Sequence, residues 1–348
     1  MMTRLASLII PIFIALLAVS LLDTDHQRSA SAHDDAYQQE LVKGKDLLRR
    51  RQYEEALKSF ERANEMREKK SAECFTLMSE AYLGLGAHKS VIESADKVIE
   101  LAGDDQLLIL KAYNNKGLAL QASAEKKDQK KLRAAEAAFR QALTMEGAWP
   151  VIRYNLGVTL LQLNRDAEGT AEINQYIKAQ PNGAYVDIAR KMAENPRRAR
   201  ENYAPDFSFT SSHGEHISLE DLRGKVVVLD FWGTWCHPCV YSVPSLRNMH
   251  KKYSKEPSFV LLGISSDRDE DVWKEFTEKN SMVWPQFRDH DGRIHRAFGI
   301  RAFPTYIVID HEGIVRFTST GASWDDSVDL HSAIQKQLKI VAKSVAVN

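Results

Sequence analysis

The sequence predicts two architectures in one chain: an all-α solenoid of helical repeats and, after it, an α/β domain. Three observations indicate this multidomain fold class. The chain has 348 residues, and ordinary domains contain about 150, so about two domains are expected. Residues 35–200 contain helical patterns that recur every 35 to 40 residues, as in repeat proteins. Residues 203–348 alternate strand-like and helix-like segments, as α/β domains do.

The composition excludes several classes of protein. Hydrophobic residues make up 44% and charged residues 27% of the chain, with 10 Pro and 17 Gly, which is typical of a packed globular protein. Lys and Arg together number 47, as do Asp and Glu, so no net charge is available to hold a nucleic acid or an anionic membrane surface. The three cysteines are too few for the disulfide framework of a small secreted domain.

Residues 1–32 are interpreted as a signal peptide or a membrane anchor. Leu5 to Leu22 form a nearly continuous apolar run of 18 residues, which Arg4 precedes. The small residues Ala30, Ser31 and Ala32 fit a signal cleavage site, whereas the length of the apolar run also fits an uncleaved anchor. In either case the positive amino terminus stays in the cytoplasm. We therefore expect an exported, periplasmic or extracytoplasmic protein, soluble after cleavage or held by its anchor.

The helical region contains one pattern four times. Gly44 is followed by Ala56, Phe60 and Ala63 at offsets of 12, 16 and 19 residues. Small residues let two helices approach closely, and a large side chain fills the space between neighbouring repeats. The pattern resembles the tetratricopeptide (TPR) repeat. The further sets are Ser79, Val91, Ala95 and Val98; Gly117, Ala135, Phe139 and Ala142; and Gly157, Gly169, Ile173 and Tyr176.

The TPR resemblance implies a concave groove that binds a protein or peptide ligand, and a capping helix that we expect at 184–199. Asn115 and Asn155 occupy the same repeat position. They are expected to face either that groove or solvent. Cys74 lies near a helix core position, so we expect a buried, unreactive thiol.

The second domain, 203–348, begins with an expected edge hairpin and a continuous apolar strand, VVVLDFW at 226–232. Hydrophobic periodicity then predicts the remaining elements. These are a helix at 239–253, a strand at 258–265, a helix at 270–279, a loop, a hairpin of strands 305–310 and 315–320, and a terminal helix.

Cys236 and Cys239 form a CxxC motif where the apolar strand gives way to a helix. Cysteines at this spacing can close a small disulfide, and the free N–H groups at a helix start stabilise the first thiolate. Such a thiolate attacks a substrate disulfide, and Cys239 then resolves the mixed disulfide. The alternatives are an inert disulfide or half of a zinc site, although no second CxxC or suitably spaced His pair follows. No metal or other cofactor is expected.

With APDF at 204–207 and FWGTWCHPC at 231–239, the motif resembles the thioredoxin superfamily, and within it the TlpA/ResA-like thiol-disulfide oxidoreductases. The resemblance covers residues 203–340. It implies a central mixed sheet flanked by helices and a redox-active disulfide. A cis-proline loop faces the disulfide in this family and binds extended substrates, which assigns substrate binding to Phe303 and Pro304. A trans proline at the start of a strand is the alternative for Pro304.

The resemblance also implies a catalytic role for Asp230, the family's buried acid, as the group that accepts the Cys239 proton. Its alternative is a capping carboxylate at a strand end. Trp235 is expected to shield the disulfide and contact substrate, or else to pack in the core. Many ResA-like proteins carry a glutamate at the position of Ser242, so the acid role rests on Asp230 or is absent. The histidines expected on the surface are His290, His295 and His311.

The sequence therefore predicts an exported thiol-disulfide oxidoreductase whose TPR repeats recruit protein partners. The resemblance favours reduction of protein disulfides, with electrons from a membrane redox partner. One alternative is a TPR adaptor or scaffold with a subsidiary redox domain. Another is a thioredoxin-fold peroxidase, although Gly233, Thr234 and Trp235 before Cys236 lack the peroxiredoxin pattern.

Overall fold

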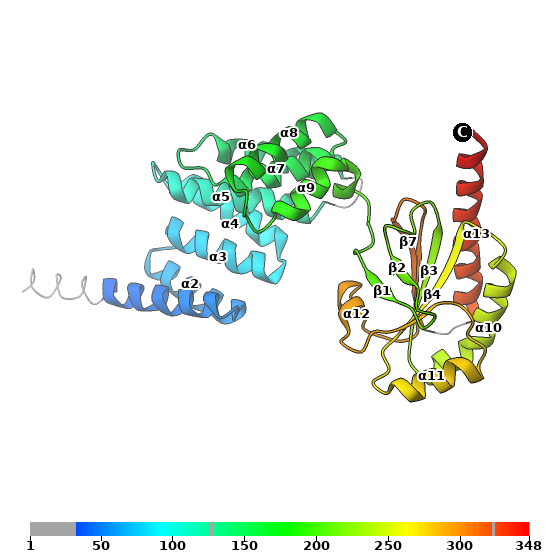
Figure 1. Cartoon of the computed structure of the whole chain (residues 1–348). Helices are drawn as coiled ribbons and strands as arrows, with labels where there is room; N and C mark the ends of the chain where they lie inside the picture. The colour runs from blue at the N-terminus through cyan, green and yellow to red at the C-terminus, as the bar shows by residue number, and fades with distance from the viewer. Residues whose placement is uncertain (1–32, 125–127, 322–323, 348) are drawn as a thin grey trace, which may run out of the picture. The chain divides into compact units, whose positions relative to one another are not determined.

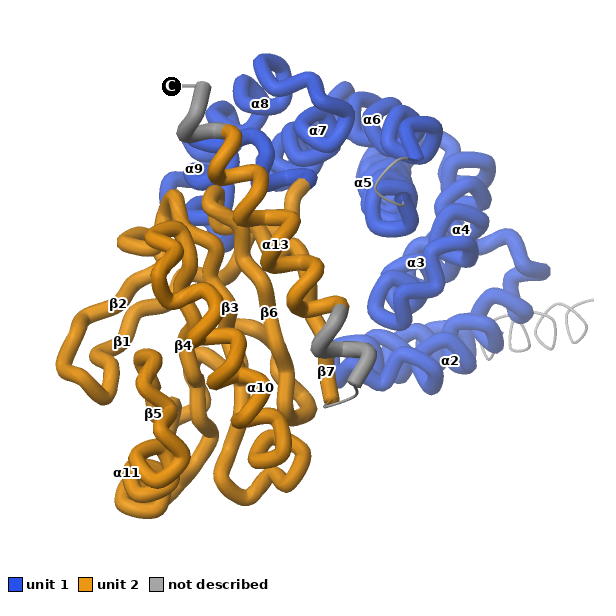
Figure 2. Tube along the Cα trace, turned by 90° about the vertical axis from the view of Figure 1, so that its right-hand side faces the viewer, with its two compact units in different colours: residues 1–200 blue, residues 201–348 orange. Residues whose placement is uncertain are grey.

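The computed structural model describes residues 33–124, 128–321 and 324–347. The chain divides into two compact units, Met1–Arg200 and Glu201–Asn348 (Figure 2), here called the helical unit and the α/β unit. The predicted fold class is confirmed, since an all-helical region precedes a thioredoxin-like α/β domain. The signal peptide or anchor predicted at 1–32 lies outside the described residues. Within the described ranges, no helix is both long enough and apolar enough to cross a membrane.

The helical unit consists of paired helices. Its elements are a helix at 33–49, α2 (Tyr53–Met66), α3 (Ala72–Leu85), α4 (His88–Leu101), α5 (Gln106–Ala122), α6 (Gln129–Leu143), α7 (Pro150–Gln162), α8 (Asp166–Ala179), α9 (Val186–Glu194) and the short 3-10 helix η1 (Pro196–Ala199). Helix α3 packs on α4, α5 on α6 and α7 on α8, and α5 also contacts both α3 and α7. Figure 2 shows the result as a curved stack, which is the arrangement of a helical-repeat array.

Three glycines of the repeat pattern form notches that receive a large side chain from the following helix. A Cβ atom added at any of them would lie within 2.6 Å of that side chain, far inside van der Waals contact. Only glycine fits there, because the side chains that fill the notches are fully buried. The three pairs are Gly44 with Phe60, Gly117 with Phe139 and Gly157 with Ile173.

Two details of the helical unit differ from expectation. Asn115 faces neither a groove nor solvent, since it is 6% exposed and its Nδ2 donates to Ser79 Oγ across 2.8 Å. The amide thus joins α5 to α3, a long-range partner that periodicity cannot reveal. The capping helix predicted at 184–199 is interrupted at Asn195, after which Pro196 opens η1, because proline disfavours a helical conformation in the residue before it.

Cys74 is fully buried and free, as expected. Burial raises the pKa of its thiol, which also lies 4.0 Å from the Tyr37 hydroxyl. A thiol that is both buried and protonated reacts slowly.

The α/β unit is built on a five-stranded mixed sheet (Figure 1). Its elements are β1 (Ser208–Thr210), β2 (His216–Ser218), β3 (Val226–Trp232), α10 (His237–Tyr253), β4 (Phe259–Ser265), α11 (Glu270–Lys279), β5 (Gln286–Arg288), α12 (Arg293–Ala297), β6 (Thr305–Ile309), β7 (Val315–Thr320) and α13 (Trp324–Val347). The strand order is β5-β4-β3-β6-β7. Strands β3, β4 and β5 run parallel, while β6 pairs antiparallel with β3 and β7.

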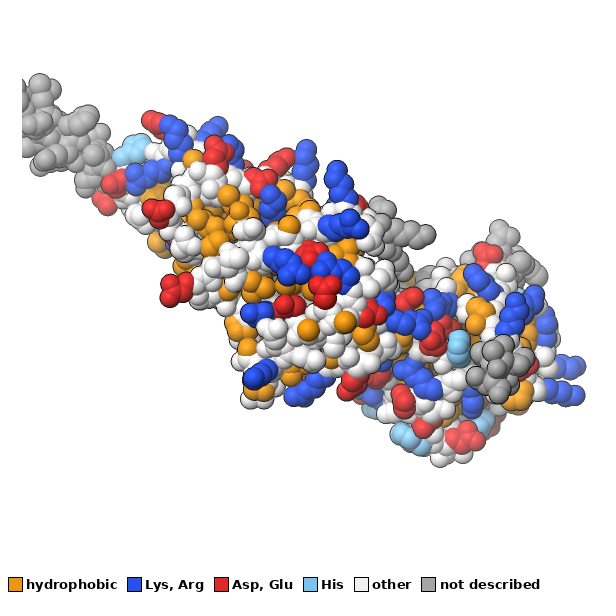
Figure 3. Space-filling model, turned by 90° about the horizontal axis from the view of Figure 1, so that it is seen from above, with side chains coloured by type: hydrophobic (Ala, Val, Ile, Leu, Met, Phe, Trp, Pro, Cys, Tyr) orange, Lys and Arg blue, Asp and Glu red, His pale blue; other side chains and the backbone are white. Residues whose placement is uncertain are grey.

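Both faces of the sheet are covered. Side chains of α10, α11 and α13 form a core on one face, while the β1–β2 hairpin and α12 cover the other. All seven residues of β3 are therefore buried, which explains its continuous apolar sequence. On the face that Figure 3 shows, charges of both signs are intermixed, with hydrophobic side chains between them.

The predicted strands and helices of this unit are confirmed, with two corrections. The loop expected between 279 and 305 contains β5 and α12, whose three and five residues are too few to show a period. The first main helix, α10, begins at His237 and not at 239. This earlier start places Cys236 at the N-cap of α10, immediately before the first helical residue.

We predict that Gly117→Ala destabilises the helical unit. Alanine favours a helix over glycine by about 1 kcal/mol, but its methyl group would overlap the Phe139 ring, and overpacking costs about 1–3 kcal/mol. With about 2 kcal/mol for the overlap, the expected net loss is about 1 kcal/mol, measured on the full chain by urea unfolding followed by circular dichroism. Adding Phe139→Leu, which makes room, should recover part of the loss in a double-mutant cycle. A Gly117→Ala variant as stable as the parent would contradict the conclusion that only glycine fits against Phe139.

Candidate active site

The CxxC cysteines lie at the carboxyl end of β3. A disulfide joins Cys236 to Cys239, whose Cα atoms are 5.3 Å apart. Both are buried, at 6% and 2% exposed, so Cys236 is the more exposed residue of the two. The Cys236 Sγ accepts a hydrogen bond from the Cys239 N–H across 3.2 Å.

The local sequence explains this placement. Strand β3 ends at Trp232, and the turn that follows is closed by a hydrogen bond from Cys236 N–H to Gly233 O at 3.1 Å. Helix α10 then begins, with Pro238 in its first turn, a position where the missing N–H of proline costs nothing. The reduced Cys236 would face the free N–H groups and the positive end of the helix, which favour a thiolate.

Asp230 lies inside β3, two residues before its end. It is 1% exposed, and its Oδ1 has no hydrogen-bond partner in the described part of the chain. Its register neighbours are Gly263 on β4 and Tyr306 on β6, so it does not cap a strand end. Burial raises the pKa of Asp230 to about 8, because an apolar interior disfavours the charged carboxylate.

The predicted substrate loop contacts Trp235, the residue immediately before Cys236. The Phe303–Pro304 peptide bond is cis, and Phe303 packs against the core that contains both cysteines. The Trp235 ring meets the Phe303 ring edge-on, with centroids 5.2 Å apart. Trp235 is 58% exposed, so it does not pack in the core. The structure thus brings together the cysteines, the cis-proline loop and an exposed aromatic surface.

Ser242 occupies the position where many family members carry glutamate. Its side chain forms a hydrogen bond within its own helix. Its hydroxyl donates to Cys239 O across 2.7 Å. The serine therefore offers no acid there, and Asp230 is the carboxyl that the sequence reasoning assigned to this site.

His295 corrects one sequence expectation, because it is only 8% exposed and not a surface residue. Its Nδ1 lies 2.7 Å from Asp289 Oδ2, and its ring contacts Phe231 and Phe303 at centroid distances of 5.1 and 5.5 Å. Burial raises the pKa of Asp289, but the hydrogen bonds from His295 outweigh it and leave that pKa below its usual value. The pair thus packs against Phe303. Because His295 lies in a polar segment of the sequence, this buried position was not predicted.

Sequence reasoning also missed Asp267, a 3% exposed carboxylate. Both of its oxygens lie 3.1 Å from the Thr234 N–H. Its Oδ1 also accepts from the Thr234 hydroxyl at 2.7 Å, and its Oδ2 accepts from the Ser265 hydroxyl at 2.6 Å. An acid directly after a buried parallel strand was the signal, because the carboxyl ends of β3 and β4 meet at one edge of the sheet.

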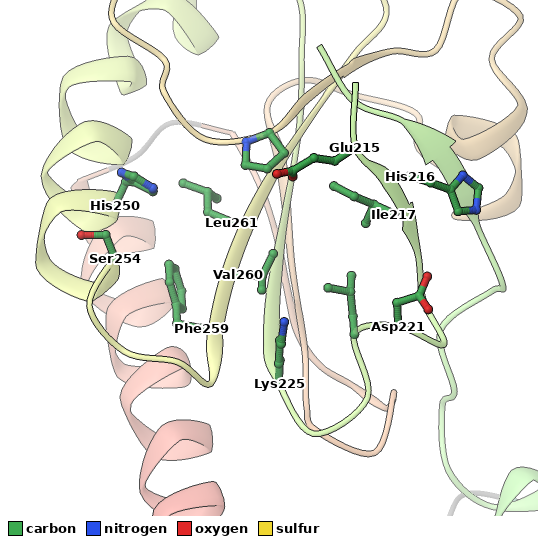
Figure 4. Close-up of a pocket in the computed structure, with 12 residues that line it drawn as sticks. Glu215, His216, Ile217, Asp221, Lys225, His250, Ser254, Phe259, Val260 and Leu261 are labelled. Carbon is green, nitrogen blue, oxygen red and sulfur yellow. The ribbon is translucent and has the colours of Figure 1, made fainter. Parts of the chain in front are cut away.

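A pocket of about 360 Å³ lies elsewhere in this unit. Figure 4 shows His250 of α10 and Ser254 just after that helix on one side, and Glu215, His216 and Asp221 on the other. His250 follows Cys236 by fourteen residues, so a helical rise of 1.5 Å per residue places the pocket about 20 Å from the cysteines. The pocket is separate from the CxxC site. Within the described ranges, no cluster of three His, Cys, Asp or Glu side chains could hold a metal ion.

Comparisons with known proteins match the α/β unit. The model of the AhpC/TSA family matches residues 201–318. The thiol-disulfide oxidoreductase ResA of Bacillus thuringiensis subsp. konkukian is 35% identical over 112 residues, which cover 32% of this chain and 64% of that protein. The thioredoxin-like protein YneN of Bacillus subtilis is 31% identical over 119 residues, covering 34% of this chain and 69% of YneN.

One similar solved structure is a putative thiol:disulfide interchange protein DsbE from Chlorobium tepidum. It is 30% identical, covers 40% of this chain and 96% of that chain, and has a TM-score of 0.38. The chain thus spans slightly less than two thirds of the ResA protein and more than two thirds of YneN. Through its α/β unit, the chain belongs to the thioredoxin superfamily and, within it, to the ResA-like thiol-disulfide oxidoreductase family.

Proposed function

We propose that this protein is an exported thiol-disulfide oxidoreductase that reduces disulfides in protein substrates, and that its helical unit recruits protein partners. The observation that carries the proposal is the Cys236–Cys239 pair at the start of α10, next to the cis Phe303–Pro304 bond. The family supports thiol-disulfide chemistry. The direction, the export and the partners are our inference.

The reaction follows from the site. The Cys236 thiolate attacks one sulfur of the substrate disulfide, forming a mixed disulfide and releasing one substrate thiolate. Cys239 then loses its proton to Asp230 and attacks Cys236 Sγ, which releases the second substrate thiolate and closes the Cys236–Cys239 disulfide. The substrate gains the two electrons that the pair loses. A membrane-bound dithiol protein would return the pair to its reduced state.

The cis-proline loop and its aromatic neighbours would bind the substrate. An extended segment could pair with the backbone beside Pro304, while the exposed Trp235 ring, held against Phe303, covers the apolar residues that flank a substrate disulfide. What supports these roles is the ring contact between Phe303 and Trp235, the residue before Cys236, together with the cis bond before Pro304.

The glycine notches of the helical unit support a recruiting role for this unit. Repeat arrays built in this way present a curved surface along which a peptide or protein can bind, and the TPR assignment makes such a partner the natural ligand. A TPR adaptor in which the redox domain is subsidiary is the second candidate, and the cysteine variants below distinguish the two.

Replacing Cys236 should abolish activity. We expect Cys236→Ser to reduce insulin disulfides only at the background rate, since the nucleophile is lost, whereas Cys239→Ser should accumulate a mixed disulfide that denaturing gels detect. The matched control is Cys74→Ser, a buried cysteine in the other unit, which should keep full activity. A parent that reduces insulin no faster than the double Cys236→Ser/Cys239→Ser variant would leave the adaptor as the function. Rapid peroxide consumption by the parent would instead support the peroxidase.

The second prediction concerns Asp230. A carboxyl whose pKa is raised by folding, here from 3.8 to about 8, opposes folding at every pH above the lower value. Asp230→Asn removes this cost, so we expect it to stabilise the protein at pH 7 by on the order of 4 kcal/mol. The gain should vanish towards pH 4, where the carboxyl is protonated in both the folded and the unfolded state.

Asp230→Asn should nevertheless slow resolution by Cys239. In the parent this step should accelerate as pH rises towards 8, because the carboxylate is the form that accepts the proton. In the variant that acceleration should be lost. Urea unfolding and stopped-flow thiol release between pH 5 and 9 measure the two effects, with the exposed Asp187→Asn as control. A variant that matches the parent in both measurements would exclude Asp230 as the acid.

A further inference from the structure

Asp267 takes no part in the proposed reaction, yet it contacts the turn that carries Cys236. Strands β3 and β4 are parallel, and Trp232 at the end of β3 pairs with Ser265 at the end of β4. The chain after β4 therefore emerges beside the turn after β3. At this point the Asp267 carboxylate accepts both the backbone N–H and the hydroxyl of Thr234, two residues before Cys236.

These contacts hold the turn in place. Thr234 lies inside the segment that the hydrogen bond from Cys236 N–H to Gly233 O closes. Asp267 itself is held by Ser265 through two hydrogen bonds. The Ser265 hydroxyl donates to Asp267 Oδ2, and the Asp267 N–H donates to the Ser265 hydroxyl oxygen across 3.0 Å. The end of β4 thus fixes the position from which α10 begins.

In the described part of the chain, the contacts give this negative charge no cationic partner. Both oxygens act only as acceptors, as in an ionised carboxylate, and the groups that donate to them are neutral: one backbone N–H and two hydroxyls. A buried negative charge near a thiol disfavours the thiolate, because like charges repel strongly where water is excluded. The effect opposes that of the positive helix end.

We propose that Asp267 is a positioning residue that sets the redox balance of the Cys236/Cys239 pair: through Thr234 it fixes the turn before Cys236, and its buried charge disfavours the Cys236 thiolate. This inference rests on the proposed function. Because a more stable thiolate favours the reduced pair, removing the charge should make the disulfide easier to reduce.

The test is Asp267→Asn, which keeps the shape and an acceptor oxygen but removes the charge. Iodoacetamide alkylation of full-length protein in a Cys74→Ser/Cys239→Ser background reports Cys236 alone. We expect the midpoint of its pH profile to fall by about half to one pH unit. With both cysteines of the pair present, equilibration with glutathione should shift towards the dithiol by about three- to tenfold.

Asp269→Asn is the matched control. It removes the same charge two residues further along, from an exposed side chain that caps α11 by accepting the N–H groups of Asp271 and Val272. The midpoint of its alkylation pH profile should equal that of the parent. Equal midpoints for Asp267→Asn and Asp269→Asn would overturn the proposal.

A second variant decides the matter if Asp267→Asn does not fold. Thr234→Ala removes the 2.7 Å hydroxyl contact but leaves the charge less compensated, so the alkylation midpoint should move to higher pH. An unchanged or lower midpoint would contradict the inference. Failure of the parent pair to equilibrate with glutathione would refute the proposed function instead, while the alkylation midpoints would still test Asp267.

Discussion

Burial of β3 on both faces is the constraint on which the rest of the α/β unit depends. Every residue of this strand is buried, so each of its backbone groups must find a partner in β4 or β6. The parallel register with β4 then brings the ends of both strands to the same edge of the sheet. The chain can turn only there, and the turn delivers Cys236 to the start of α10. Cys236 is thus placed by the packing of a strand that contains neither cysteine.

The three parallel strands each carry an acid at or near their carboxyl end, and each acid has a different environment. Asp230 lies among apolar side chains, where the protonated form is favoured. Asp267 is surrounded by neutral donors, and Asp289 has a histidine partner. Side chains of the same type therefore differ in what they can do: one is a buried carboxyl with a raised pKa, one accepts hydrogen bonds at a turn, and one pairs with a histidine that contacts Phe303. The differences arise from the neighbours that the sheet supplies.

Sequence reasoning captured the features that are local or periodic. The apolar run of β3, the CxxC at its end and the recurring glycines all leave a mark within a few residues, and each element is found where its pattern placed it. It failed where a residue acts through a distant partner. His295 looked like a surface histidine because Asp289 and two phenylalanines complete its environment only in the fold. Asn115 was misjudged because its partner, Ser79, lies one repeat away. Strand β5 and α12 were missed because they are shorter than the period that would reveal them.

The isolation of Cys74 has a practical consequence. The chain has three cysteines, and with the CxxC disulfide closed, the single remaining thiol is sealed inside the helical unit. A thiol-reactive dye should then label the oxidised native protein only when α3 opens locally, and at a rate governed by the free energy of that opening. Labelling of Cys74 therefore reports local opening of the helical unit alone, because the closed disulfide of the α/β unit does not react with the dye.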